Sequence, residues 1–257
     1  MGRKWGQHFL RSPRTIEKIV EAASLCSNDV VLEIGPGEGV LTLPLCEVAE
    51  QVHAFEIDPE LAERLKQRGV SNLRVHQMDF LKADSAELPG HREWVVAANL
   101  PYYITAPIME RLFWQRPLTV KRAVLMMQEE VARRVSEPAS RQAGALTYIA
   151  GAFFKVEYLF KVPPGCFAPP PKVDSAVIRL TPRGEPQGLH ESARQTYEQL
   201  VSTAFRGRRK QLGKSLRALH PEAPDLLAEA GIDPKRRPET LTVQEFWEAT
   251  RKWPHCE

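Results

Sequence analysis

The stretch Glu33-Ile34-Gly35-Pro36-Gly37-Glu38-Gly39 decides the fold. It ends a short apolar run, residues 30–34, which predicts a buried strand, and it precedes apolar residues with helical spacing at Leu41, Leu45 and Val48. Glycines in such a turn let the backbone bend sharply and approach a ligand that a Cβ would exclude. The sequence therefore predicts a strand, a turn that can hold a ligand, and a helix.

The segments that follow repeat this alternation. Ser12 and Pro13 open a first helix, as N-cap and first-turn residue. Because strands separated by helices pair in parallel, we expect an α/β fold with a Rossmann-like sheet. Two β-rich runs joined by a proline-rich loop are expected to finish the sheet as an antiparallel pair. The expected strands are 30–34, 51–56, 73–76, 94–98, 123–127, 153–162 and 175–180, and the expected helices between them include 59–67 and 104–114.

The alternation of predicted strands and helices ends near residue 181. Residues 181–188 are typical of a linker, and the pattern beyond residue 190 is helical to the end. We therefore expect two domains, a Rossmann-like α/β domain over 1–182 and a small all-α domain over 189–257.

Composition excludes several classes of protein. The 257 residues are 43% hydrophobic and 26% charged, which argues against a disordered or fibrous chain. No apolar run approaches the ~18 residues of a membrane span, and the N-terminus lacks the apolar core of a secretory signal. Four cysteines lie far apart, which favours a reducing cytoplasm and offers no ligand cluster for a metal. Nothing in the sequence requires more than a monomer.

The net charge is only +3, so a nucleic-acid partner must be inferred from where the basic residues lie. Two stretches, 2–16 and 205–219, are basic and contain no acid. Such local density suits a phosphate backbone, although a solvated helix face is the alternative. The basic residues of interest are Lys4, Arg11, Arg206, Arg208, Arg209, Lys210 and Lys214.

Two acidic residues follow later strands. Glu56 ends the second predicted strand, where a carboxylate can accept hydrogen bonds from both hydroxyls of a ribose. Asp79 and Phe80 follow the third strand, where a carboxylate and a ring suit an adenine. Asp79 could instead be a simple helix cap. The glycine spacing differs from the nicotinamide fingerprint and is similar to the first motif of S-adenosylmethionine-dependent methyltransferases.

The tetrapeptide Asn99-Leu100-Pro101-Tyr102 ends the fourth strand. An exocyclic amine is a poor nucleophile because its lone pair is delocalised into the ring. The Asn99 side-chain oxygen and a backbone carbonyl can accept both amine hydrogens, while Tyr102 stacks on the base. Because the proton can leave after methyl transfer, no strong base is required.

Taken together, these motifs resemble those of the small-subunit (16S) ribosomal RNA adenine dimethyltransferases of the KsgA type, over nearly the whole chain. The resemblance implies N6,N6-dimethylation of two adjacent adenosines near the 3′ end of that RNA, late in assembly of the 30S subunit, with S-adenosylmethionine as cofactor. The segments that carry it are 4–10, 33–39, 55–58, 78–80, 99–102, 128–134, 167–177 and 205–216.

The resemblance also implies roles for single residues. Asn99 and the carbonyls of Leu100 and Pro101 would hold the amine, with Tyr102 and Phe167 on the two faces of a flipped base. Phe167 could instead be plain core. Two positions depart from the family pattern, because His8 and Tyr103 stand where asparagine is usual. Residues expected to contact the cofactor are His8, Leu10, Gly35, Gly37, Glu56, Ile57, Asp79, Phe80 and Asn99.

Three alternatives stay open. Asn99 to Tyr102 also suits the large-subunit rRNA adenine methyltransferases of the macrolide-resistance type, although the 169–175 block and the basic helix favour the small-subunit group. A non-enzymatic RNA-binding assembly factor would keep the fold without the activity. A DNA adenine methyltransferase would usually carry Pro-Pro-Tyr after the Asn.

Overall fold

A computed structural model describes residues 7–84, 88, 93–112, 119–137, 142–183, 191–207 and 210–254. The chain forms two compact units, Met1–Ala132 with Glu157–Pro182, and Arg133–Val156 with Arg183–Glu257. Residues 133–156 thus group with the C-terminal helices, whereas the predicted domains, 1–182 and 189–257, divide the chain once. Those domain assignments remain a prediction.

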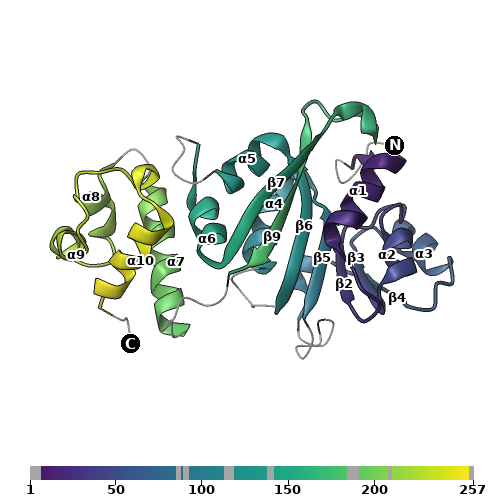
Figure 1. The fold of residues 1–257 in the computed structure, drawn as a ribbon, viewed down its shortest axis with the longest axis horizontal. Coiled ribbons are helices and arrows are strands. Elements are labelled where there is room, and N and C mark those ends of the chain that lie inside the picture. The colour runs from purple at the N-terminus through teal and green to yellow at the C-terminus, as the bar shows by residue number, and fades with distance from the viewer. Residues whose placement is uncertain are drawn as a thin grey trace. The chain divides into compact units, whose positions relative to one another are not determined.

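The first unit is built on a seven-stranded sheet of order β4-β3-β2-β5-β6-β9-β7 (Figure 1). Neighbours from β4 to β6 pair in parallel, and β9 pairs antiparallel with β6, which confirms the expected α/β class. The strands are β2 (Val30–Ile34), β3 (Gln51–Glu56), β4 (Leu73–Gln77), β5 (Trp94–Asn99), β6 (Val120–Gln128), β7 (Phe154–Val162) and β9 (Ser175–Pro182).

The order of the strands creates the place for a ligand. The chain runs outward from β2 through β3 to β4 and then returns to the other side of β2 as β5. Open α/β sheets bind ligands at the carboxyl ends of the strands at such a reversal. The glycine turn after β2 and Asn99 at the end of β5 therefore lie at the switch point.

Helices cover both faces of this sheet. On one face α1, α2 and α3 bury Ile19, Leu45 and Leu65 in the core with Val31 and Val95. Ser12 caps α1 by accepting the Thr15 backbone N–H, as predicted. Helices of the first unit are α1 (Pro13–Ala23), α2 (Thr42–Val48), α3 (Pro59–Lys66), α4 (Thr105–Glu110), the start of α5 (Glu129–Ser136) and the short 3₁₀ turns η1 (Phe80–Lys82), η2 (Tyr102–Ile104) and η4 (Pro164–Cys166).

A second, two-stranded sheet was not predicted. β1 (Phe9–Leu10) pairs antiparallel with β8 (Phe167–Ala168), and the Arg11 N–H donates to the Cys166 carbonyl at 2.7 Å. This pairing ties the N-terminal segment to the proline-rich loop between β7 and β9.

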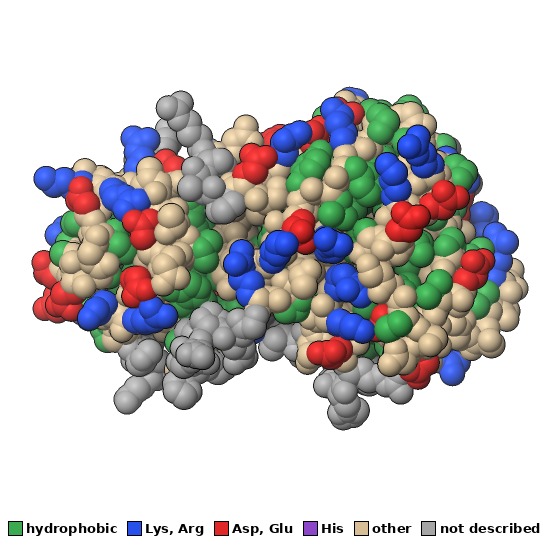
Figure 2. Space-filling view, viewed as in Figure 1, with side chains coloured by type: hydrophobic (Ala, Val, Ile, Leu, Met, Phe, Trp, Pro, Cys, Tyr) green, Lys and Arg blue, Asp and Glu red, His purple; other side chains and the backbone are tan. Residues whose placement is uncertain are grey.

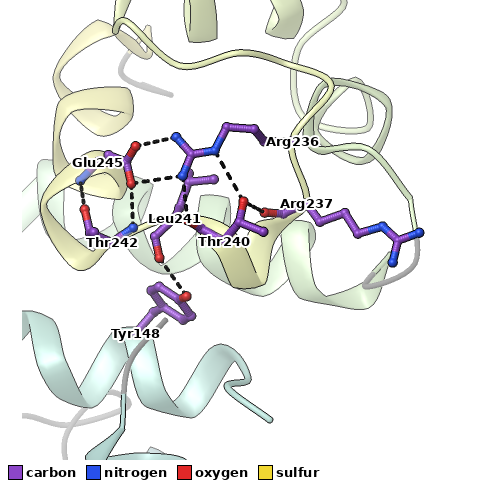
Figure 3. A network of polar contacts seen from close by, with 7 residues as sticks. All are labelled: Tyr148, Arg236, Arg237, Thr240, Leu241, Thr242 and Glu245. Carbon is purple, nitrogen blue, oxygen red and sulfur yellow. Dashed lines mark hydrogen bonds and ion pairs between the residues drawn. The ribbon is translucent and has the colours of Figure 1, made fainter. Parts of the chain in front are cut away.

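The second unit is helical. Its helices are α6 (Ala145–Phe153), α7 (Glu191–Arg206), α8 (Leu212–Leu216), α9 (Ala223–Glu229) and α10 (Val243–Lys252), with the 3₁₀ turn η5 (Pro238–Thr240). Tyr148 on α6 donates to the Leu241 carbonyl at 2.8 Å, and Thr242 and Glu245 form a capping box that starts α10 (Figure 3). Arg236 joins this network through Glu245.

Candidate cofactor and target-base pocket

One pocket gathers most of the predicted cofactor and target residues. It is lined from the N-terminal segment, the glycine turn and the ends of β3, β4 and β5. Its lining includes His8, Leu10, Gly35, Gly37, Glu56, Ile57, Asp79, Phe80, Asn99, Leu100, Pro101 and Tyr102. These residues were predicted from separate motifs of the sequence, and the sheet brings them together.

The glycine turn is shaped as a cradle. Gly35 and Gly37 have φ of +69° and +58°, a conformation that favours glycine. A Cβ on Gly37 would lie 3.1 Å from the Phe9 ring, so the N-terminal segment closes directly against this turn.

Glu56 is fixed at the end of β3 by backbone donors. Its Oε2 accepts the Gly37 N–H at 3.0 Å and its Oε1 accepts the Asp58 N–H at 2.9 Å. Burial raises the pKa of Glu56, while these two N–H donors oppose the rise. Since a carboxylate has about four acceptor positions, both oxygens can still accept from a ligand.

Beside Glu56 lies an aromatic and acidic end of the pocket. Asp79 caps η1 by accepting the Leu81 N–H at 3.0 Å, so it is both a helix cap and a lining residue. Phe80 is buried and packs edge-on against Phe55 with ring centroids 5.5 Å apart.

Glu33 is a pocket residue to which the sequence motifs assigned no role. It is fully buried in β2, and its Oε2 accepts no hydrogen bond from the part of the chain that the structure describes. Burial raises the pKa of Glu33 to about 8, and the nearby charge of Glu56 contributes to the rise. The sequence signal that could have indicated this residue is its position as the first residue of the glycine motif, residues 33–39.

The two departures from the family pattern both line the pocket. The His8 ring stacks on Tyr102 with centroids 5.8 Å apart, and its Nδ1 lies 2.9 Å from the Pro169 carbonyl. Tyr103 is 59% exposed. Partial burial of its side chain, together with the charges of Asp79 and Glu56, raises the pKa of its hydroxyl.

Phe167 is not among the residues that line this pocket, although its strand partner Leu10 is. Its side chain is 5% exposed, belongs to the apolar core and pairs through its backbone with Leu10. The structure buries this ring in the core. Its predicted contact with a base stays a prediction.

The predicted RNA-binding residues that the structure describes fall outside the pocket lining. Arg206, Lys210 and Lys214 are exposed, and none of them pairs with a carboxylate of the described ranges. Arg11 forms an ion pair of 2.6 Å with Glu38 of the glycine turn. Lys4, Arg208 and Arg209 lie outside the described residues.

Neither a metal centre nor a membrane span is found in the described ranges. Their His, Cys, Asp and Glu side chains form no group of three or more that could hold a metal ion. None of the helices described is both long and apolar enough to cross a membrane.

The parallel sheet, its reversal and the glycine cradle define a Rossmann-like methyltransferase of the S-adenosylmethionine-dependent class. A family model described as ribosomal RNA adenine dimethylase matches residues 2–252. The chain belongs to that family, which confirms the resemblance found in the sequence.

Individual relatives agree with this assignment. The chain is 38% identical to a ribosomal RNA small subunit methyltransferase A of Nitrosococcus oceani, over 98% of this chain and 95% of the relative. It is 40% identical to the protein of that name from Chlorobium phaeobacteroides, over 95% and 90%.

Solved structures give the same fold. A dimethyladenosine transferase from Plasmodium falciparum superposes with a TM-score of 0.77 at 28% identity, over 94% of this chain and 96% of that one. The 23S rRNA methyltransferase ErmE superposes with a TM-score of 0.73 at 34% identity, over 95% and 98%.

Proposed function

We propose that this chain transfers methyl groups from S-adenosylmethionine to N6 of two adjacent adenosines of small-subunit (16S) rRNA, during assembly of the 30S subunit. The orientation of Asn99 is the observation that carries the proposal. Its Nδ2 donates to the His8 carbonyl at 3.4 Å, so its Oδ1 is left as an acceptor at the pocket. An amine N–H of the target base is the donor that this oxygen suits.

The second acceptor is the carbonyl of Leu100. The Pro101 carbonyl already accepts from the Ile104 N–H at 3.2 Å and from the Thr105 hydroxyl at 3.1 Å. No donor of the described chain bonds to the Leu100 carbonyl. Of the two carbonyls that the sequence offered, that of Leu100 is therefore the better candidate.

The pocket also suits the cofactor. Gly35 and Gly37 line it without a side chain, Glu56 can take ribose hydroxyls, and Asp79 with Phe80 can take an adenine. The partnerless Oε2 of Glu33 fits a cationic amino group. When bound, S-adenosylmethionine supplies an electrophilic methyl group carried on a sulfonium.

The chain's own contribution is orientation and electrostatics. Asn99 Oδ1 and the Leu100 carbonyl accept the two amine hydrogens, which increases electron density on N6 and aligns its lone pair. Tyr102 supplies a ring on which the base can stack. The amine proton is released to water once the nitrogen has become cationic.

The choice of subunit rests on the relatives. The matches named for the small subunit are 38–40% identical, whereas the 23S enzyme ErmE is 34% identical. On the face drawn in Figure 2, Lys and Arg side chains lie among Asp and Glu, so charge over that face alone does not mark an RNA site. The basic segment 206–214 is the proposed RNA contact, and we propose a cytoplasmic monomer.

Asn99→Ala tests the chemistry. We expect it to lower methyl transfer to undermethylated small subunits by at least ~100-fold, as removal of an oriented polar group does at other active sites. Cofactor affinity by calorimetry should change little. Asn72→Ala is the matched control, because Asn72 Nδ2 donates only to the Cys46 and Ala49 carbonyls and lies outside the pocket lining. Equal loss of cofactor binding in Asn99→Ala would make Asn99 structural.

Mass spectrometry separates the competing functions. Methylated nucleotides should map to adjacent adenosines of small-subunit RNA and be absent from large-subunit RNA and DNA. Methylation of large-subunit RNA instead would favour the ErmE-like alternative. RNA binding without measurable cofactor affinity would favour the non-enzymatic assembly factor.

A further inference from the structure

The hydroxyl of Tyr102 is tied to the sheet by a single buried partner. Tyr102 Oη and Ser175 Oγ are 2.6 Å apart and share a hydrogen bond. Tyr102 lies on the short turn η2, whereas Ser175 is the first residue of β9 and is 0% exposed. This hydrogen bond therefore fixes the turn η2 to the sheet.

The ring of Tyr102 is held on a second side as well. His8 stacks on one face of it, and His8 is in turn anchored through Nδ1 to the Pro169 carbonyl. With one face covered and the hydroxyl bonded, the opposite face of the Tyr102 ring is left for a ligand. Ser175 and Pro169 flank the same loop, so this loop orients the ring at two points.

Ser175 itself has little freedom to move. The preceding residue, Asp174, accepts the Glu129 N–H through its carbonyl at 3.0 Å. The Asp174 carboxylate pairs with Lys161 at 2.7 Å, and Lys161 also pairs with Glu129 at 3.1 Å. These contacts fix the loop where it enters β9, next to the hydroxyl that reaches Tyr102.

We propose that Ser175 is a positioning residue for the target base, and that it acts through the hydroxyl of Tyr102 by setting the angle of the stacking ring. The proposal rests on the proposed function, because it assigns Tyr102 to the base. Loss of either hydroxyl should let the ring turn away from the geometry that aligns N6. Since the cofactor's contacts do not involve this bond, only the methyl-transfer step should change.

A double-mutant cycle on the full chain tests this coupling. Ser175→Ala, Tyr102→Phe and the double variant are compared by single-turnover methyl transfer to undermethylated small subunits at saturating cofactor. Each single change should slow transfer by about fivefold to tenfold, the range of one lost hydrogen bond, and the double variant should be no slower. Cofactor affinity should stay at the wild-type value.

Thr250→Val is the matched control. Thr250 is fully buried in the second unit, and its hydroxyl donates to the Phe246 carbonyl at 2.8 Å. This variant should lose thermal stability and keep the wild-type rate, which separates a general loss of stability from the effect on Tyr102.

Multiplicative effects of the two changes, or a wild-type rate in Ser175→Ala, would overturn the proposal. Should Ser175→Ala be too unstable, Ser175→Cys keeps nearly the same volume with a weaker donor, and the same cycle is run with it. Absence of transfer by the wild-type chain would instead reject the proposed function, so the two failures are distinguishable.

Discussion

At the scale of the residue, Glu33 is a carboxyl group that the fold buries in the lining of the pocket. Burial raises its pKa from 4.5 to about 8. Between these values the native protein binds more protons than the unfolded chain. The free energy of unfolding contributed by this group therefore falls as pH rises from about 4.5 to about 8, and is level above that.

Glu33→Gln removes this titration. We expect the melting temperature of the variant, relative to the wild type and without cofactor, to rise by several degrees between pH 5 and pH 8.5. Differential scanning calorimetry across that range measures it. Parallel melting curves for the two proteins at every pH would show that Glu33 does not titrate in this window.

Residues that the sequence assigned to one site line one pocket where a motif fixed both the residue type and its place at a strand end. Glu56 and Asn99 are the last residues of β3 and β5, and Asp79 follows β4. Because these strands run parallel in the order β4-β3-β2-β5, strand pairing alone brings the three residues to one edge of the sheet. Phe167 could not be placed in this way. An aromatic ring in a proline-rich loop is equally compatible with core and with ligand contact, and only tertiary packing decides between them.

At the scale of the element, the glycine turn depends on the segment that closes against it. Gly37→Ala would impose an unfavourable φ of +58° on alanine and bring its Cβ to 3.1 Å from Phe9. Relief of this contact must displace Phe9 or the turn, both of which line the pocket, so we expect cofactor affinity by calorimetry to fall by about tenfold, which corresponds to ~1.4 kcal/mol.

Gly69→Ala is the matched control for this change. Gly69 also has a positive φ, of +66°, but a Cβ there would meet nothing within 4 Å. It should lower stability by ~1 kcal/mol and leave cofactor affinity unchanged. Equal cofactor affinities in the two variants would contradict the role assigned to the Phe9 contact.

The strands of the sheet were predictable because each is a short apolar run between turn signals. Four other elements were not. β1 and β8 are two residues each and pair across more than 150 positions of sequence, which leaves no local pattern. α5 begins directly where β6 ends, and α6 is buried over most of its length and runs directly into β7, so no loop or clear periodicity separates them.

At the scale of the whole molecule, the pocket and the basic segment belong to different compact units. Every residue that lines the pocket lies between Gln7 and Ile108, within the first unit. The segment 206–214 lies in the second unit. Cofactor binding and the attraction of RNA should therefore respond to different substitutions.

The sequence separates the C-terminal helices from the sheet because residues 181–188 interrupt both patterns. It does not show that residues 133–156 pack with those helices. That grouping depends on long-range contacts such as the hydrogen bond from Tyr148 to the Leu241 carbonyl, which has no signal within either segment.

Replacement of Arg208, Arg209 and Lys210 by glutamine should weaken RNA binding and leave cofactor affinity unchanged. Each lost phosphate contact should reduce the slope of log affinity against log salt by ~0.7 to ~0.9, because fewer counterions are released. Filter binding of small-subunit RNA at several salt concentrations measures the slope. A control that replaces the exposed Lys235, Arg237 and Lys252 removes the same charge from the same unit. If both triple variants lose affinity with equal slopes, the effect is one of overall charge, and the RNA does not contact the 208–210 segment specifically.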